Sequence, residues 1–338
     1  MKVTVLGAGG WGTTLALVLH ERNAEVTLWE FFEDYAALLD KTRENTKFLK
    51  GIKIPGSIKI TSDLKEAVES AEILVLAVPS HIMRSLAEKI KKLDYKKKIF
   101  VSVAKGVEQE TLKPMSGVIS GVLGRVKFAV LSGPSHAEEV ALKKPTTVVA
   151  ASKNRKLAEK IQELFSTNYF RVYANTDVRG VEIGGSLKNV IAIAAGIVDG
   201  MEAGDNTKAA LITRGLAEMR RLGVRLGAHD STFFGLSGIG DLVVTCASTH
   251  SRNRSVGEQL GRGKKIAEIL KGMEMVAEGV KTSLSAYKLS KKYRVEMPIT
   301  TEIYRIIYED KSPYDSVRDL MNRALKSENE LLNRSPKK

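Results

Sequence analysis

The sequence predicts an α/β protein in two parts: a doubly wound, largely parallel sheet over residues 1–177 and an all-α domain over residues 178–338. In the first part, short apolar runs alternate with helix-like segments, which is the order that builds a parallel sheet covered by helices. From about Val178 onward the patterns are almost entirely helical. A chain of 338 residues is long enough for two domains with cores of their own.

The strands are predicted from short apolar runs in the first part of the chain. The run at 72–78, EILVLAV, is apolar and rich in β-branched residues, as in a strand that is buried on both faces. The other predicted strands are residues 3–6, 25–29, 99–103, 128–131, 146–151 and 170–173. Helical spacing lies between them at 13–20, 82–93 and 157–165.

The second part contains one helix pattern that is apolar nearly all round. Residues 187–198, LKNVIAIAAGIV, are therefore predicted as a buried core helix. A capping box of Ser255 and Glu258 predicts that a later helix begins at Ser255. The further helix patterns are 209–222, 258–270, 282–291, 300–308 and 316–324, with Pro298 and Pro313 near two of the starts.

Composition narrows the class of protein. No apolar run reaches the roughly 18 residues that a membrane span needs, and the first residues enter a predicted strand directly, so neither stable membrane insertion nor a signal peptide is expected. The single cysteine, Cys246, excludes an intrachain disulfide and suits a reducing cytoplasm. No His/Cys cluster has the spacing of metal ligands, and no metal is expected.

The net charge of +14 raises the alternative of a nucleic-acid-binding protein. The basic residues are scattered, however, and the denser groups at 89–98 and 288–294 resemble exposed helix ends. A solvated, lysine-rich surface explains this pattern more simply, so no nucleic-acid partner is expected.

A glycine-rich motif follows the first predicted strand. Residues 7–12, GAGGWG, match G-x-G-x-x-G and open a predicted helix. Gly7 permits a tight turn, Gly9 permits close approach of a pyrophosphate, and Gly12 permits close packing of helix on strand. The helix N-terminus then offers free N–H groups to the phosphates. With Glu30 at the end of the second strand, the motif predicts a Rossmann-type dinucleotide site.

Three further segments follow predicted strands and therefore lie at the carboxyl edge of the sheet, where ligands bind. Residues 78–81, VPSH, either line a ligand or form a strand-to-helix turn with a serine cap. Lys105 is placed to reach a cofactor or a substrate, the alternative being a solvated loop lysine. Residues 133–137, GPSHA, provide a tight turn and a helix start.

Lys188 is the most informative single residue. It lies at the head of the predicted core helix, and Gly184, Lys188 and Ala192 share one helix face because they are four residues apart. That face carries almost no side chains, so another element or a ligand can approach the amine. A lysine in such a place loses its charge readily and can act as an acid or base. The alternative is a lysine that reaches solvent from the first turn.

A second polar cluster lies further along the chain. Asp241 follows a glycine-rich segment and either orients a neighbour or substrate hydroxyl or simply forms a turn. Residues 251–254, SRNR, are predicted at a helix head, where two arginines, a serine and an asparagine suit a phosphate or carboxylate. An exposed basic loop is the alternative.

Together these motifs resemble the NAD(P)-dependent glycerol-3-phosphate dehydrogenase family of bacterial type over nearly the whole chain. The resemblance rests on GAGGWGTTLA at 7–16, VPSH at 78–81, AKG at 104–106, GPSHAEEV at 133–140, GSLKNVIAIAAG at 185–196, GLSGIGDLVVTC at 235–246, SRNR at 251–254 and VAEGVKT at 276–282. It implies reversible hydride transfer between NAD(P)H and dihydroxyacetone phosphate, giving sn-glycerol 3-phosphate for phospholipid synthesis.

The resemblance also implies roles for individual residues. Lys188 matches the family's acid/base, with Lys105 and Asp241 as further catalytic candidates. The implied substrate contacts are Lys105, Gly133, Ser135, Lys188, Asp241, Ser251, Arg252 and Asn253. The implied cofactor contacts are Gly10, Trp11, Phe31, Lys105, Ala137, Arg252, Val276 and Glu278. The glycine motif itself adds Gly7, Gly9, Gly12 and Glu30 to the expected cofactor contacts.

Two positions depart from the family pattern. His136 stands where a bulky apolar residue is expected, and the run from Trp29 to Asp34 lacks the basic residue that many relatives carry there. Because a carboxylate at Glu30 repels the extra phosphate of NADP, NAD is the expected preference over NADP.

Two alternatives to this function remain at the level of sequence. Another hydroxyacid or ketoacid reductase can share the fold plan, but it has no need of the phosphate-binding cluster at 251–254. The other alternative is a dinucleotide-sensing or nucleic-acid-binding protein. That function does not explain why a lysine lies on a buried, glycine-lined helix. The expected partner is a small phosphate-bearing substrate, the expected compartment is the cytoplasm, and a homodimer is left open.

Overall fold

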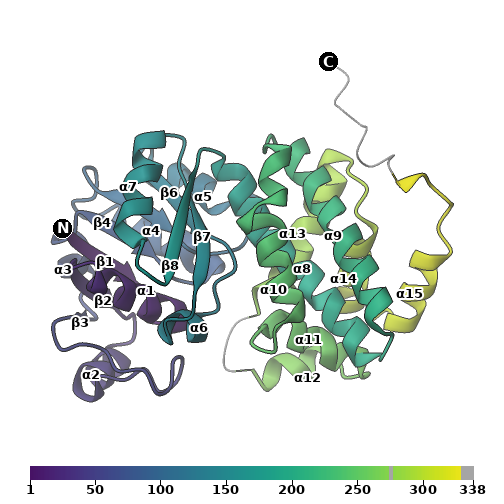
Figure 1. Ribbon diagram of the computed structural model, residues 1–338, viewed down its shortest axis with the longest axis horizontal. Helices are drawn as coiled ribbons and strands as arrows, with labels where there is room; N and C mark the ends of the chain where they lie inside the picture. Colours follow the sequence, from purple (N-terminus) through teal and green to yellow (C-terminus); the bar gives the residue numbers. More distant parts are fainter. Residues whose placement is uncertain (274–276, 329–338) are drawn as a thin grey trace.

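The computed structural model describes residues 1–273 and 277–328, which form two parts side by side (Figure 1). Within these ranges the first part holds a sheet of eight strands in the order β3-β2-β1-β4-β5-β6-β7-β8. Neighbouring strands are parallel except for β6 and β7, so the predicted doubly wound sheet is confirmed. The strands are β1 (Lys2–Leu6), β2 (Glu25–Trp29), β3 (Lys59–Thr61), β4 (Ile73–Leu76), β5 (Ile99–Ser102), β6 (Lys127–Ser132), β7 (Thr146–Ala151) and β8 (Phe170–Asn175).

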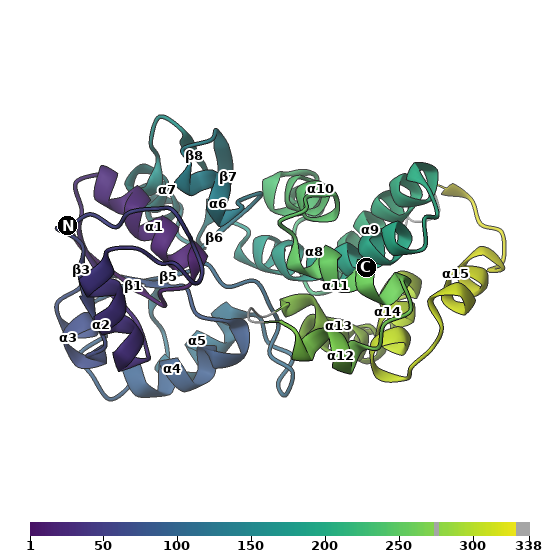
Figure 2. The ribbon, with the colours of Figure 1, turned by 90° about the horizontal axis from the view of Figure 1, so that it is seen from below.

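Helices cover both faces of the sheet (Figure 2). Helices α1 (Gly10–Glu21) and α7 (Arg155–Phe165) pack on one face, and α3 (Leu64–Glu69), α4 (Met83–Ile90) and α5 (Met115–Leu123) pack on the other. Strand β4 is apolar throughout because both of its faces are covered by core. Its residues 73 and 75 enter one layer of core and residues 74 and 76 enter the other, so every position is buried. The remaining helices of this part are α2 (Glu33–Thr42) and α6 (Ala137–Ala141).

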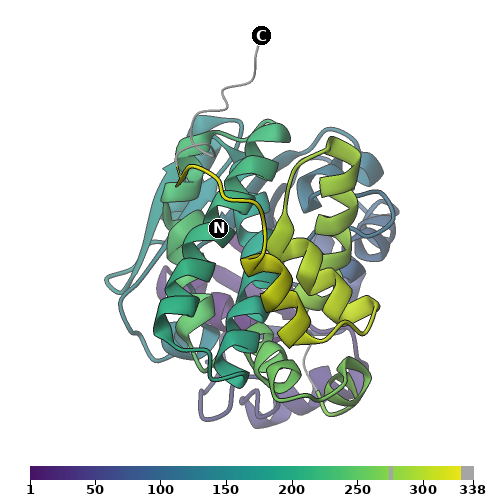
Figure 3. The same cartoon turned by 90° about the vertical axis from the view of Figure 1, so that its right-hand side faces the viewer.

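The second part is helical and is built around α8 (Val178–Gly200) (Figure 1). Figure 3 looks onto this part with the sheet behind it. Helix α8 is the one described helix with the length and apolar character of a membrane span, and its apolar window is wholly buried inside the protein, as in a core helix. The other helices are α9 (Asp205–Arg225), α10 (Asp241–Ala247), α11 (Arg252–Gly261), α12 (Ile266–Lys271), α13 (Glu278–Tyr293), α14 (Pro298–Tyr308) and α15 (Pro313–Met321).

Several boundaries differ from the sequence prediction. Helix α8 begins at Val178 rather than at residue 187, because the Asp177 side chain accepts a hydrogen bond from the Gly180 amide and caps the helix there. The placement of Lys188 at the head of the helix is therefore wrong: it lies ten residues into the helix, well past the first turn, and the alternative of a lysine in the first turn is excluded.

Helix α11 also begins earlier than predicted. Its N-cap is Ser251, whose hydroxyl accepts a hydrogen bond from the Arg254 amide, so Ser255 lies inside the helix and not at its start. The single helix predicted over 258–270 is two helices, because the chain turns at Gly263 with φ +88°. Strand β3 and helices α2, α3, α5 and α10 were not predicted; they are short or carry weak apolar periodicity.

Candidate active site

A cavity of about 950 Å³ opens between the sheet and the helical part. One wall consists of the loops that follow β1, β2, β4, β5 and β6, and the facing wall comes from α8, α10 and the start of α11. Strands β1 and β4 are neighbours in the sheet. The chain continues from β1 to β2 on one side of this pair and from β4 to β5 on the other side. The cavity thus occupies the crevice at the carboxyl ends of the strands where open α/β sheets bind their ligands.

The glycine motif forms the floor of this cavity. Gly7 has φ +117°, and a side chain there would meet the Ala77 carbonyl oxygen at 2.9 Å. A side chain at Gly12 would meet the Gly7 oxygen at 1.9 Å, so the helix packs against the turn as expected. A Cβ at Gly9, by contrast, would have nothing within 4 Å, which leaves its backbone open to a ligand. Helix α1 starts at Gly10 with no side-chain cap, and its first N–H groups suit a pyrophosphate.

The far end of the cavity combines a buried carboxylate with an exposed aromatic ring. Glu30 follows β2 and is only 8% exposed, and its carboxylate accepts a hydrogen bond from the Phe32 amide. Phe31 is 55% exposed and offers an aromatic surface beside it. The structure adds two lysines that sequence reasoning missed: Lys89 lies 4.4 Å from the centre of the Phe31 ring, and Lys47 also lines this end. No nearby sequence motif marks either lysine, because both come from other segments.

At the other end of the cavity, Lys188 belongs to a connected set of buried polar groups. Its Nζ donates hydrogen bonds to Asp241 Oδ1 at 2.5 Å and to Thr245 Oγ1 at 2.5 Å. The second carboxylate oxygen of Asp241 accepts one from Lys105 Nζ at 2.6 Å, and Lys105 also donates to the Gly133 carbonyl at 2.9 Å. The single carboxylate of Asp241 therefore binds two lysines, one from each part of the protein.

The electrostatic setting of Lys188 favours proton exchange. Burial lowers the pKa of its amine to about 8, with Asp241 opposing that change and the positive charge of Lys105 adding to it. The residue is 6% exposed and Asp241 is 1% exposed, so water screens their interaction weakly. An ammonium has three N–H bonds, and two are used by Asp241 and Thr245 among the described residues. The third is available to a ligand in the cavity that Lys188 lines.

The small-residue face of α8 is confirmed as a place of close approach. A side chain at Gly184 would meet the Ser237 carbonyl oxygen at 2.5 Å, and one at Gly196 would meet the Arg254 oxygen at 1.9 Å. The segment before α10 and helix α11 therefore touch the backbone of α8, which brings Asp241 and the start of α11 to Lys188. This packing explains why a glycine-lined helix carries the lysine.

The cluster at 251–254 divides into residues that face the cavity and one that does not. Arg252 remains exposed along the cavity wall, and Ser251 and Asn253 line it while being largely buried. The Asn253 side chain accepts a hydrogen bond from the Gly279 amide at 2.9 Å. Arg254 turns away and pairs with Asp199 at 2.6 Å, so the expectation of two arginines at one anion site is corrected to one.

The VPSH segment connects the two parts of the protein. The Ser80 amide and hydroxyl both donate to the Glu278 carboxylate, at 2.9 and 2.6 Å, which fixes the first residue of α13 against the sheet. The serine-cap interpretation is wrong. The short helix here is Ser80–Ile82, and its N-cap residue is Pro79, which makes no capping hydrogen bond through its side chain. Val78 and Pro79 line the cavity.

Most of the expected site residues meet at this cavity. Those on its wall are Gly7, Gly9, Gly10, Trp11, Gly12, Glu30, Phe31, Lys105, Ser135, Ala137, Lys188, Ser251, Arg252, Asn253 and Glu278. Gly133 and Asp241 lie behind the wall and hold Lys105 and Lys188. Val276 lies outside the described residues. Thr245 was missed, although its position four residues after Asp241 would place both on one helix face had α10 been predicted.

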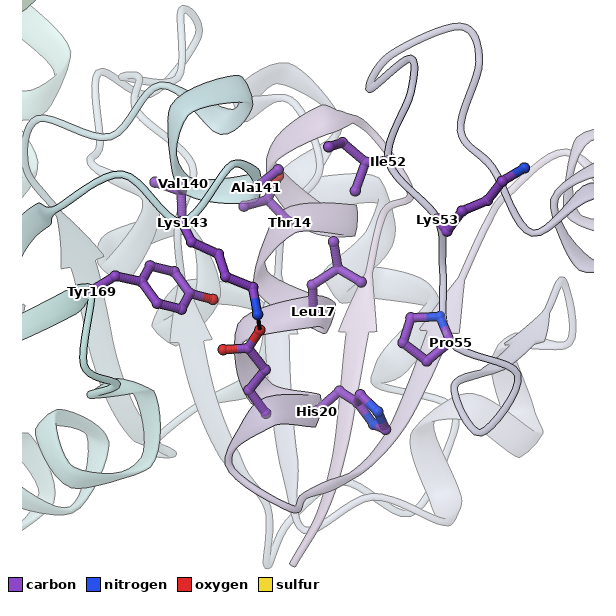
Figure 4. A pocket seen from close by; sticks show the side chains of 11 residues that line it. Thr14, Leu17, His20, Ile52, Lys53, Pro55, Val140, Ala141, Lys143 and Tyr169 are labelled. Atoms are coloured by element: carbon purple, nitrogen blue, oxygen red, sulfur yellow. Dashed lines mark ion pairs between the residues drawn. The ribbon is translucent and has the colours of Figure 1, made fainter.

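A smaller hollow of about 220 Å³ lies apart from this cavity (Figure 4). It is bordered by α1, by residues near Pro55 and by the segment around Lys143. The Lys143 ammonium is paired with Glu21 at 2.6 Å, and both residues line the hollow. Lys143 and Glu21 thus neutralise each other, and Lys53, which also lines the hollow, is paired with Glu44.

The chain was compared with known proteins. Family models described as NAD-dependent glycerol-3-phosphate dehydrogenase N-terminus and C-terminus match residues 2–158 and 177–318. Proteins named glycerol-3-phosphate dehydrogenase (NAD(P)+) from Chlorobium phaeobacteroides and a Thermoanaerobacter species are each 53% identical to it, over 97% of this chain and 99% of theirs.

Solved structures agree with these matches. The crystal structure of glycerol-3-phosphate dehydrogenase from Coxiella burnetii has a TM-score of 0.92 and 38% identity, covering 95% of this chain and 99% of that one. A ketopantoate reductase from Ralstonia eutropha, with a TM-score of 0.61, 14% identity and coverage of 94% and 100%, shares the fold alone. The chain therefore belongs to the NAD(P)-dependent glycerol-3-phosphate dehydrogenase family, whose members are oxidoreductases that use NAD or NADP.

Proposed function

We propose that this chain reversibly reduces dihydroxyacetone phosphate to sn-glycerol 3-phosphate with NAD(P)H, and that Lys188 is its proton donor. The observation that carries the assignment of Lys188 is its place on the cavity wall, hydrogen-bonded to Asp241 and Thr245 with one N–H left over. The fit of the glycine motif to a pyrophosphate supports a dinucleotide along the rest of the cavity.

The residues around Lys188 suit the needs of ketone reduction. A bound nicotinamide supplies the hydride, and the ketone oxygen becomes negative as that hydride reaches the carbon. The Lys188 ammonium stabilises this charge and then gives the oxygen its proton. Asp241 keeps the amine charged enough to do so at neutral pH, and Lys105 holds Asp241 from the other side. In the reverse direction the neutral amine accepts the proton of the alcohol.

The substrate phosphate belongs at the start of α11 in this proposal. Arg252 lines the cavity there in the first turn of the helix, and the N-cap residue Ser251 lines it as well. Ser135, from the sheet side, and Asn253, from α11, also line the cavity and are candidate contacts. Binding energy from this remote group positions the ketone against the nicotinamide, so a substrate without phosphate should react poorly.

The remaining features of the proposal concern the cellular setting. We infer a cytoplasmic enzyme that supplies glycerol 3-phosphate for phospholipid synthesis, with no nucleic-acid partner, no stable membrane insertion, and a homodimer as its candidate assembly. NAD is proposed as the preferred cofactor, because Glu30 lies where the ribose of the adenosine is expected.

The test of this function is the rate of NADH and NADPH oxidation with dihydroxyacetone phosphate, measured beside unphosphorylated dihydroxyacetone. The proposal expects rapid turnover of the phosphorylated ketone and slow turnover of its analogue. Equal rates with both would contradict the phosphate site, and no turnover with either would contradict the function itself.

A further inference from the structure

Two histidines that the proposed reaction leaves without a role pack against each other at the lining of the cavity. His136 follows β6 in the sheet part, and His250 lies just before α11 in the helical part. Their ring centres are 5.7 Å apart with the planes tilted by 48°, and both line the cavity. The pair therefore bridges the two parts at the end of the cavity where Ser251 and Arg252 begin α11.

His136 has an unused polar atom. Its Nε2 is buried and has no hydrogen-bond partner among the described residues. A buried polar nitrogen without a partner is costly, and in a binding site it is explained most simply by a partner that arrives with the ligand. His250 is exposed, so its ring is accessible from the same space.

The charges around His136 indicate what that ligand carries. Burial lowers the pKa of its imidazole, and the nearby positive charges of Lys188 and Lys105 and the ring of His250 lower it further, against the effect of Glu138. The ring is therefore neutral at pH 7 in the ligand-free protein, with one N–H to donate. With Lys105, Lys188 and Arg252 all lining the same cavity, the group that best satisfies this N–H is an anion.

We propose that the adjacent imidazoles of His136 and His250 contact the phosphate of the substrate side by side, together with Arg252. The inference rests on the proposed function, since it assigns two further specificity-determining residues to that same substrate. The phosphate then contacts both parts of the protein, because each part contributes one imidazole to it.

The test compares His136→Phe and His250→Ala with the native enzyme, using dihydroxyacetone phosphate and dihydroxyacetone as substrates. Phenylalanine keeps the ring and removes the polar atom. We expect the KM for the phosphorylated ketone to rise about ten-fold in each variant, the size of one lost charge-assisted hydrogen bond, with kcat changed less than about two-fold. The rate with dihydroxyacetone should stay as in the native enzyme.

His20→Phe is the matched control, because His20 lies on α1 beside the smaller hollow and outside the cavity. It should leave both substrates unaffected. The His250 ring is exposed, so its removal should leave folding intact. An equal loss with both ketones in His136→Phe, or an unchanged KM in His250→Ala, overturns the inference. Failure of the underlying function shows differently, as absence of turnover by the native enzyme.

Discussion

Replacing Asp241 with asparagine tests how the buried carboxylate sets the acidity of Lys188. The change keeps the shape of the side chain and removes the charge that lies 2.5 Å from the Lys188 amine. An opposite charge in contact typically moves a pKa by about one to three pH units. From its value of about 8, the pKa of Lys188 should therefore fall to between about 5 and about 7 in Asp241→Asn.

The expected loss of rate follows from the share of protonated amine. At pH 7.5 that share is about three quarters for a pKa of about 8, and it drops to about one quarter or less for a pKa of about 7 or below. Ketone reduction should thus slow by about three-fold to a few hundred-fold at pH 7.5, and recover as the pH is lowered.

The assay is kcat for reduction of dihydroxyacetone phosphate at saturating NADH, measured from pH 5.5 to about 9 in the native enzyme and in Asp241→Asn. Asp230→Asn serves as the control, because Asp230 pairs with Arg220 away from the cavity. If kcat of Asp241→Asn falls with rising pH at the same pH as kcat of the native enzyme, the reasoning that Asp241 sets the pKa of Lys188 is refuted.

Three other substitutions separate the roles of the site. Lys188→Met should lower kcat by about two to four orders of magnitude and leave NADH binding by fluorescence titration nearly unchanged, since proton donation is lost while the glycine motif is untouched; near-normal turnover would exclude Lys188 as the acid. Arg252→Ala should raise KM for dihydroxyacetone phosphate and spare the slow rate with dihydroxyacetone; a matching loss with both would mean that Arg252 does not read the phosphate. Glu30→Ser should raise kcat/KM for NADPH relative to NADH by about ten-fold or more. The substitution removes the repulsion between the Glu30 carboxylate and the extra phosphate of NADPH, while Lys47 and Lys89 remain. An unchanged ratio would show that Glu30 does not select the cofactor.

The parts of the fold that could be predicted from sequence are those with a strong local signal. Strand β4 is apolar at every position because both its faces are buried, and Pro298 and Pro313 occupy the first turns of α14 and α15. Strand β3 gave no such signal, since its three residues are half-buried at most and lie at the edge of the sheet. Local periodicity cannot report an element whose position is fixed only by its neighbours.

The candidate site follows the same rule. Lys188 could be singled out because its glycine neighbours lie in the same sequence segment, and these glycines prove to be where α11 and the segment before α10 touch α8. The start of α8 was misplaced, because Asp177 caps it through contacts that reach to His229 and Thr232. Lys89 lines the cavity from α4, and only the folding of the chain brings it to Phe31.

The most direct measurement of the role of Lys188 is the pH dependence of kcat in both directions in the native enzyme. Reduction of the ketone needs the protonated amine, and oxidation of the alcohol needs the neutral amine. Because the pKa of Lys188 is lowered to about 8, kcat for reduction should be high below that pH and fall above it, whereas kcat for oxidation should be low below it and rise above it. Two profiles that move in the same direction, or that stay flat through pH 8, would contradict proton transfer by Lys188.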